Sequence, residues 1–139
     1  MFAGDAAVPT HRVRALRTFV YPGPSIKMPP LADLSLGAML AGLVARFPDR
    51  PAIVEDRTIG YRELDALAGV IGAQLAARGV GRGDRVALYL GNCWEFLAVL
   101  FACVRIGAIV VPIGTRQRHA ELEFLLNDSG AKVLIHEPD

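Results

Sequence analysis

The sequence has few of the features that mark specialised classes of protein. Its 139 residues carry 15 Lys and Arg against 14 Asp and Glu, so the net charge is only +1. This balance gives no electrostatic basis for binding nucleic acid or an anionic membrane. Cys93 and Cys103 are the only two cysteines, which argues against a disulfide scaffold and fits a reducing compartment.

Long apolar segments and targeting signals are also missing. The longest apolar run, residues 96–104, is too short to span a bilayer and stops at Arg105. The N-terminus lacks the succession of basic and then apolar residues found in a signal peptide. We therefore expect no transmembrane segment and a cytoplasmic protein. The three histidines show no metal-ligand spacing, and no metal site is expected.

The chain has instead a high apolar content, with 53% hydrophobic residues and a positive mean hydropathy. Such a content favours either a well-buried α/β domain or a piece whose apolar surface something else covers. Five prolines interrupt residues 1–33, for which we expect an extended N-terminal arm. Regular periodicity begins at Leu34, so residues 34–139 form the predicted folded domain.

Helix and strand patterns alternate along this domain. Helical spacing predicts helices over residues 36–47, 61–75 and 96–106 and a further one around 122–126. Short apolar runs predict a hairpin from 52–54 and 58–61, and strands at 85–90, 108–113 and 131–136. The last three strands alternate with helices as two consecutive βαβ units. This order predicts an α/β fold with a parallel sheet, helices packed on it and a small β-hairpin.

Two details of these elements are specific predictions. Asn92 and Glu95 have the spacing of a capping box, with Asn92 as the N-cap of the helix that follows. Residues 108–113 are apolar almost throughout, which predicts a fully buried strand.

Three glycines at alternate positions, Gly79, Gly81 and Gly83, raise the question of a phosphate-binding loop. Such a loop follows a strand and opens a helix, so that amide N–H groups face the phosphates. Here the order is reversed, because a helix precedes the glycines and a strand follows them. The stretch is therefore interpreted as a helix C-terminus and a tight turn, in which Asp84 bonds nearby amides.

Cys93 is one candidate for chemistry. It lies between a strand and the first turn of a helix, where the helix dipole lowers the pKa of a thiol. This placement keeps open a small flavodoxin-like hydrolase with a cysteine nucleophile. Gly91 supplies the first glycine of a nucleophile elbow, but Glu95 stands where the second is expected.

The carboxyl ends of the predicted strands are the second candidate, because open parallel sheets bind ligands outside these ends. The ends are Gly91-Asn92, Gly114-Thr115-Arg116 and His136. Gly114, Thr115 and Arg116 combine an accessible backbone, a hydroxyl and a guanidinium. From the residues alone, this stretch is either a ligand contact or a plain connection.

Residues 35–136 contain a series of short motifs, which are, in chain order, Tyr61-Arg62-Glu63-Leu64, Gly79-Val80, Gly83-Asp84-Arg85-Val86, Gly91-Asn92, Glu95-Phe96, Arg105-Ile106-Gly107-Ala108, Val111-Pro112-Ile113, Glu121-Leu122 and Asn127-Asp128-Ser129. In this order and spacing they resemble the N-terminal portion of the AMP-forming acyl-CoA synthetases, in the adenylate-forming superfamily. The resemblance implies a partial N-terminal subdomain of that fold. It also implies activation of a carboxylic acid by ATP and Mg²⁺ to an acyl-adenylate, which coenzyme A then attacks to release AMP.

The resemblance further implies which parts are missing. The family's phosphate loop ending in Pro-Lys-Gly, its Tyr-Gly-x-Thr-Glu segment, its hinge Asp and its catalytic Lys have no counterpart in the sequence. We therefore expect a truncated fragment that retains no cofactor and is inactive alone. In some family members the loop matching residues 113–116 lies beside the coenzyme A nucleotide, which implies a coenzyme A contact at Gly114, Thr115 and Arg116.

A non-catalytic module that forms a homodimer through exposed apolar surface is the alternative function. The acid substrate stays open among fatty, aryl and short acids, because the family builds its acyl pocket from later sequence.

Overall fold

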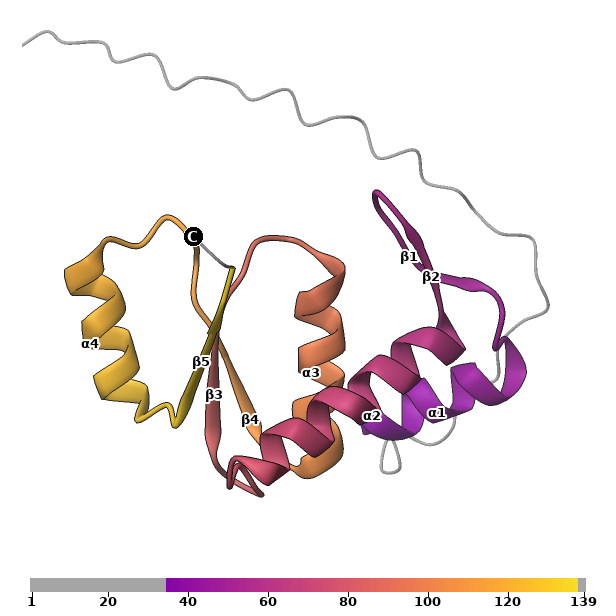
Figure 1. Ribbon diagram of the computed structural model, residues 1–139, viewed down its shortest axis with the longest axis horizontal. Coiled ribbons are helices and arrows are strands. Elements are labelled where there is room, and N and C mark those ends of the chain that lie inside the picture. The colour runs from indigo at the N-terminus through magenta and orange to yellow at the C-terminus, as the bar shows by residue number, and fades with distance from the viewer. Residues whose placement is uncertain (1–34, 138–139) are drawn as a thin grey trace, which may run out of the picture.

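The computed structural model describes residues 35–137, and the expected arm at residues 1–33 lies outside them. The elements, in chain order, are α1 (Leu36–Arg46), β1 (Pro51–Val54), β2 (Thr58–Gly60), α2 (Tyr61–Ala77), β3 (Arg85–Tyr89), α3 (Trp94–Ile106), β4 (Ile109–Pro112), α4 (His119–Ser129) and β5 (Val133–His136) (Figure 1). β1 and β2 pair as an antiparallel hairpin, whereas β3, β4 and β5 form a parallel sheet. The predicted α/β fold is confirmed.

The parallel sheet has the strand order β4-β3-β5, so β3 is central and pairs with both neighbours. Leu88 of β3 lies opposite Pro112 of β4, and Tyr89 lies opposite His136 of β5. The three strands therefore end at the same level. We call the loops that follow them the carboxyl edge of the sheet.

One face of the sheet packs against α2 and α3, and we call it the α3 face. Its core joins residues of α2, β3 and α3 and the loop before β3: Leu75, Val80, Val86, Leu88, Val99 and Cys103. A second core cluster of Leu40, Ile53, Ile59, Leu64 and Ala98 joins the hairpin and α1 to the same two helices. None of the helices between residues 35 and 137 combines the length and apolar character that crossing a membrane requires.

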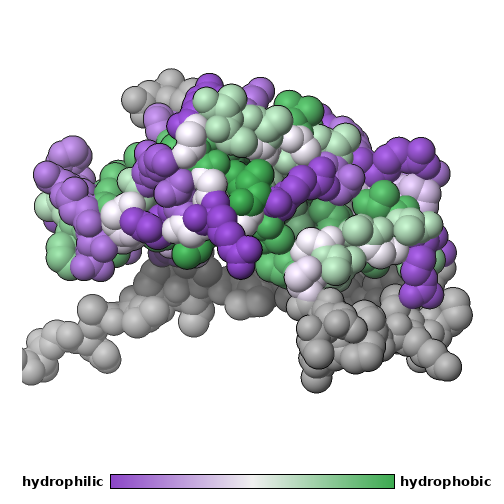
Figure 2. Space-filling model, turned by 90° about the horizontal axis from the view of Figure 1, so that it is seen from below, coloured by the Kyte–Doolittle hydropathy of each residue, from purple (hydrophilic) through white to green (hydrophobic). Residues whose placement is uncertain are grey.

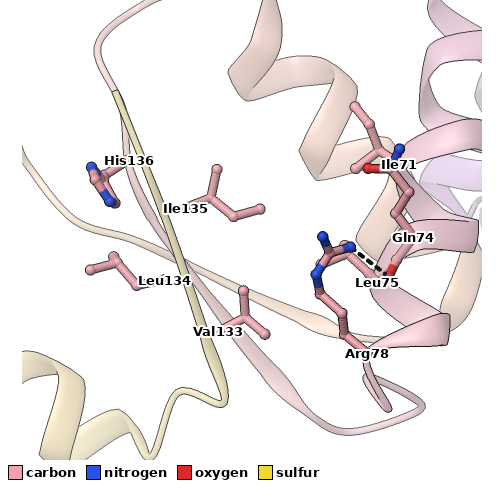
Figure 3. A pocket seen from close by; sticks show the side chains of 8 residues that line it. All are labelled: Ile71, Gln74, Leu75, Arg78, Val133, Leu134, Ile135 and His136. Atoms are coloured by element: carbon pink, nitrogen blue, oxygen red, sulfur yellow. Dashed lines mark hydrogen bonds between the residues drawn. The ribbon is translucent and has the colours of Figure 1, made fainter. Parts of the chain in front are cut away.

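The opposite face, which we call the α4 face, is only partly covered. The side chains of β5 alternate, with Val133 and Ile135 pointing towards α2 and Leu134 pointing the other way (Figure 3). Leu134 borders a pocket whose other walls come from α4, so α4 lies on this second side, next to β5 (Figure 1).

The prediction of a fully buried strand at residues 108–113 is wrong. β4 has no buried residue, and Ile109 is 51% exposed. Val110 packs against the core of the α3 face, so the side chain of Ile109 before it lies on the α4 face. α4 lies beside β5, at the other end of the sheet, and leaves this part of the α4 face uncovered.

The predicted capping box at Asn92 is also wrong. The N-cap of α3 is Cys93, which makes no side-chain cap bond, so Glu95 occupies the second helical position rather than the third that the box requires. The carboxylate of Glu55, in the hairpin, accepts the Trp94 N–H at 3.1 Å instead. The Arg57 guanidinium lies 4.9 Å from the centre of the Trp94 ring, so the hairpin holds the start of α3 by two contacts.

The interpretation of the glycine stretch as a turn is confirmed. Gly79 and Gly83 have φ values of 79° and 82°, in the left-handed region that favours glycine. The Gly81 N–H donates to the Asp84 carboxylate at 2.8 Å. The Gly79 N–H donates to the Ala76 carbonyl and the Gly83 N–H to the Gly107 carbonyl. The amides of all three glycines are therefore bonded within the protein, and the turn lies at the opposite end of the sheet from the carboxyl edge.

Candidate functional site

The carboxyl edge brings together the three strand ends that the sequence predicts to meet. Gly91 follows β3, Gly114 and Thr115 follow β4, and His136 ends β5. Because β3 is central, the loop after it lies between the other two. This arrangement is the usual place for a ligand in an open parallel sheet.

Residues 114–117 form a turn at this edge, closed by a hydrogen bond from the Gln117 N–H to the Gly114 carbonyl at 3.1 Å. We call it the 114–117 turn. A side chain of the central strand holds it, because the Tyr89 hydroxyl donates to the Thr115 carbonyl at 2.9 Å and lies 3.3 Å from the Gln117 carbonyl. A methyl group added at Gly114 would meet no heavy atom within 4 Å, so the space beside this backbone is open.

The charge around the 114–117 turn is positive. Arg116 and Arg118 lie close together in the sequence and are both exposed. Within the described chain, the Arg116 side chain forms no ion pair or hydrogen bond. The nearest acid in sequence, Glu121, accepts the Arg118 N–H at 2.8 Å. The surface therefore offers an unneutralised guanidinium beside open backbone, which suits an anion.

The other two strand ends are tied to each other. The Gly91 N–H donates to the Glu137 carboxylate at 3.0 Å. The ring nitrogen Nδ1 of His136 lies 2.6 Å from the carbonyl oxygen of Glu137. This side of the carboxyl edge is therefore occupied by its own hydrogen bonds, and the 114–117 turn is the part with unused binding groups.

Cys93 does not have the environment of an activated nucleophile. Burial raises the pKa of its thiol above the ordinary value, and the neighbouring Glu95 side chain raises it further. The expectation that the helix dipole lowers this pKa is therefore wrong, since desolvation outweighs it. Cys103 lies in the core, and burial raises the pKa of its thiol to about 11. Neither cysteine supports a hydrolase.

A pocket of about 340 Å³ lies on the α3 face between α2 and β5. Its apolar wall comes from Ile71, Leu75, Val133 and Ile135, and Arg78 stands at one end of it (Figure 3). One Arg78 guanidinium nitrogen donates to the Gln74 carbonyl at 3.1 Å, within the same helix. The pocket is therefore a partly covered region of the sheet core rather than a cluster of convergent polar groups.

Two residues of the site were not predicted from the sequence. Tyr89 and Glu137 act on backbone atoms 26 and 46 residues away. Only the parallel pairing places them next to their partners. A polar-tipped aromatic residue at the end of an apolar strand is the one hint that the sequence offers for Tyr89.

The comparison with protein families assigns the chain to a class. The sequence model of the AMP-binding enzyme family matches residues 41–139. The chain belongs to this family, which confirms the resemblance found in its motifs.

Individual relatives are acyl-CoA ligases. The long-chain-fatty-acid–CoA ligase FadD13 of Mycobacterium tuberculosis is 38% identical over 105 residues, which cover 73% of this chain and 21% of the relative. A medium-chain fatty-acid–CoA ligase of Escherichia coli is 34% identical over 105 residues, covering 74% and 19%. The chain therefore spans about a fifth of the length of these curated relatives.

Solved structures agree with this assignment. A fatty acyl CoA synthetase of Mycobacterium tuberculosis superimposes with a TM-score of 0.70 at 39% identity, covering 72% of this chain and 20% of that one. The N-terminal subdomain of Klebsiella oxytoca NpsA, in complex with anthranilyl-AMSN, gives a TM-score of 0.70 at 30% identity, covering 73% and 27%. The fold is that of part of the N-terminal subdomain of adenylate-forming synthetases.

Proposed function

We propose that the chain is the N-terminal α/β part of an acid–CoA ligase. The complete reaction converts a carboxylic acid, ATP and coenzyme A into acyl-CoA, AMP and pyrophosphate. Membership of the AMP-binding enzyme family supports the proposal, as do the relatives, which are ligases of fatty acids and coenzyme A. The cytoplasmic location stays a prediction from the sequence.

Within this reaction, the described residues contribute a binding surface for coenzyme A at Gly114, Thr115 and Arg116. The carrying observation is the 114–117 turn, which the Tyr89 hydroxyl holds at the carboxyl edge while Arg116 stays exposed and unpaired. A guanidinium and open backbone fit the phosphates of a nucleotide. Coenzyme A bound there supplies the thiol that receives the acyl group, and the turn orients its nucleotide end.

We further propose that the 139-residue chain alone does not form an adenylate. It has no counterpart of the phosphate loop, the Tyr-Gly-x-Thr-Glu segment, the hinge Asp or the catalytic Lys that the resemblance leads one to expect. Acyl activation depends on groups that position ATP and stabilise the charge that develops on its phosphates. The groups that the carboxyl edge presents serve binding rather than this charge stabilisation.

The decisive measurement is the release of AMP that depends on the acid, ATP and coenzyme A. It is made with the 139-residue chain and with the product of the whole reading frame, each with fatty, aryl and short acids. We expect no turnover from the chain alone and acid-dependent turnover from a product that includes the later motifs. Turnover by the 139 residues alone would refute their proposed inactivity.

The coenzyme A contact has its own test. Titration of the 139-residue chain with coenzyme A is followed by the backbone amide signals of residues 114–118. Arg116→Ala is expected to weaken binding roughly tenfold or more, because it removes a charge-assisted contact. Arg62→Ala is the matched control, since Arg62 pairs with Asp49 on the exposed surface and is expected to leave binding unchanged.

A homodimeric, non-catalytic module is the second candidate, and exposed apolar residues are the observation that favours it. Large apolar side chains at least 39% exposed occur at Leu36, Met39, Val54, Val70, Ile109 and Phe124. One side of the surface shows hydrophobic residues interspersed with hydrophilic ones (Figure 2). Sedimentation over a range of concentrations tests this candidate, and a monomer at the highest concentration would count against it.

A further inference from the structure

The Tyr89 side chain of the central strand forms hydrogen bonds with the 114–117 turn. It is the last residue of β3, and its side chain lies on the α4 face because Leu88 before it packs in the core of the α3 face. Its hydroxyl has a single proton, which the Thr115 carbonyl accepts at 2.9 Å, while the Gln117 carbonyl lies at 3.3 Å. Two carbonyls of the turn are therefore directed inward, towards the sheet.

The direction of the Thr115 carbonyl fixes the direction of an amide. The Thr115 carbonyl and the Arg116 N–H belong to one planar trans peptide unit, in which the two groups point in opposite directions. Because the carbonyl points at Tyr89, the Arg116 N–H points away from the sheet. Within the described chain, this N–H donates to no protein atom.

The peptide unit of Gln117 and Arg118 has the same orientation. The Gln117 carbonyl also faces Tyr89, and the N–H of the same peptide unit belongs to Arg118. That N–H is directed away from Tyr89 to the Glu121 carboxylate, which accepts it at 2.8 Å. One outward amide is therefore already bonded to an acid, and the Arg116 amide is left for a ligand.

We propose that Tyr89 is a positioning residue for anion recognition by the 114–117 turn. Its hydroxyl holds the Thr115 carbonyl inward and thereby presents the Arg116 N–H, next to the Arg116 guanidinium, to a phosphate group of coenzyme A. The inference rests on the proposed coenzyme A contact and adds the residue that shapes it. Tyr89 itself does not touch the ligand.

Tyr89→Phe tests this role, because it removes the hydroxyl and keeps the ring. We expect the variant to bind coenzyme A about two- to tenfold more weakly, as the loss of one hydrogen bond predicts. Without ligand, the Gln117 amide is expected to exchange with solvent about two- to tenfold faster, because the turn that its bond to Gly114 closes is less restrained. Tyr61→Phe, at the start of α2 and away from the turn, is the control and is expected to change neither.

A double variant separates positioning from a general loss of stability. If Tyr89 acts through Arg116, then Tyr89→Phe weakens binding in the wild-type background but adds little to Arg116→Ala. The same loss in both backgrounds, or an unchanged affinity in Tyr89→Phe, would overturn the inference.

Hydrogen exchange at the Gln117 amide, measured without ligand, distinguishes a failure of this inference from a failure of the proposed function. If the wild-type chain binds no coenzyme A, the proposed contact and the ligand part of this inference both fail. Faster exchange at Gln117 in Tyr89→Phe would then still show that Tyr89 holds the turn. Unchanged exchange together with unchanged affinity, in a chain that does bind coenzyme A, would overturn the positioning role alone.

Discussion

The helices α3 and α4 lie on opposite faces of the parallel sheet. Each connects two parallel strands, but the two helices are packed to different extents. α3 connects β3 to β4 and buries four residues, whereas α4 connects β4 to β5 and buries none. The side chain of Cys103 in α3 is 0% exposed, while Phe124 in α4 is 64% exposed. Two consecutive βαβ units of one chain therefore differ in how firmly their helices are held.

Polar contacts replace the missing apolar ones on the α4 face. The Arg85 guanidinium donates to the carbonyls of Ser129 and Gly130 at 2.9 and 3.0 Å, at the C-terminus of α4. Lys132 donates to the Gly79 carbonyl at 2.5 Å and lies 3.1 Å from the Asp84 carboxylate. Because the Arg85 bonds reach only the end of α4 and no residue of this helix is buried, we infer that α4 opens more easily than α3.

The largest expected effect contrasts Leu75→Ala with Phe124→Ala. Leu75 is 4% exposed in the core of the α3 face, so its truncation is expected to lower the free energy of unfolding by about 2–5 kcal/mol. Phe124→Ala on α4 is expected to change it by less than about 0.5 kcal/mol. Urea denaturation followed by circular dichroism measures both. Equal losses would show that the two faces are packed alike.

A smaller effect is expected from Arg85→Met, which removes the bonds to the end of α4 and keeps most of the apolar stem. We expect a loss of roughly 1–3 kcal/mol in the stability of α4, because its last carbonyls lose a cationic partner. Hydrogen exchange measures this as faster exchange in α4 with little change in α3. Arg62→Met, at an exposed pair with Asp49, serves as the control. Equal acceleration in both helices would mean that α4 does not open separately.

The smallest expected effect concerns the dependence of stability on pH. The hydrogen bond from the Gly81 N–H, and then Lys132, lower the pKa of the Asp84 carboxyl below its ordinary value. Because the pKa is lower in the folded state than in the unfolded chain, the carboxylate stabilises the fold above the ordinary pKa. This stabilisation is lost as the pH falls through the lowered value. Asp84→Asn is therefore expected to lower the urea midpoint at neutral pH and to reduce its dependence on pH below about pH 4.

Asp128→Asn is the control for this prediction, because Asp128 is exposed and forms no ion pair among residues 35–137. A variant at Asp84 that retained the full acid dependence of the wild type would contradict it.

The sequence predicted the order and type of the elements because both depend on local periodicity. The stripe of apolar residues along 61–75 appears as α2, and the positive φ values of Gly79 and Gly107 follow from the need for left-handed helix ends. The meeting of three strand ends was also predictable, since the strands of βαβ units run parallel. The predicted coenzyme A contact at Gly114, Thr115 and Arg116 falls on one of these ends.

Contacts between distant segments were not predictable. The Glu55 carboxylate caps α3 from 39 residues away, in place of the predicted local cap at Asn92. The apolar run at residues 108–113 did not indicate that its strand lies at one end of the sheet, because the periodicity of a sequence carries no information about strand order. The raised pKa of the Cys93 thiol depends on burial by packing, which outweighs the local helix dipole.

The sequence by itself determined the α/β class, the turn at Gly79 to Gly83 and the family, because each rests on the chemistry of neighbouring residues. The tertiary structure decided that Tyr89 holds the turn beside Arg116, that Arg85 ends α4 and that one face of the sheet is packed while the other stays partly open. The physical reason is that hydrogen bonds and burial act over a few ångströms of space, whatever the distance along the chain.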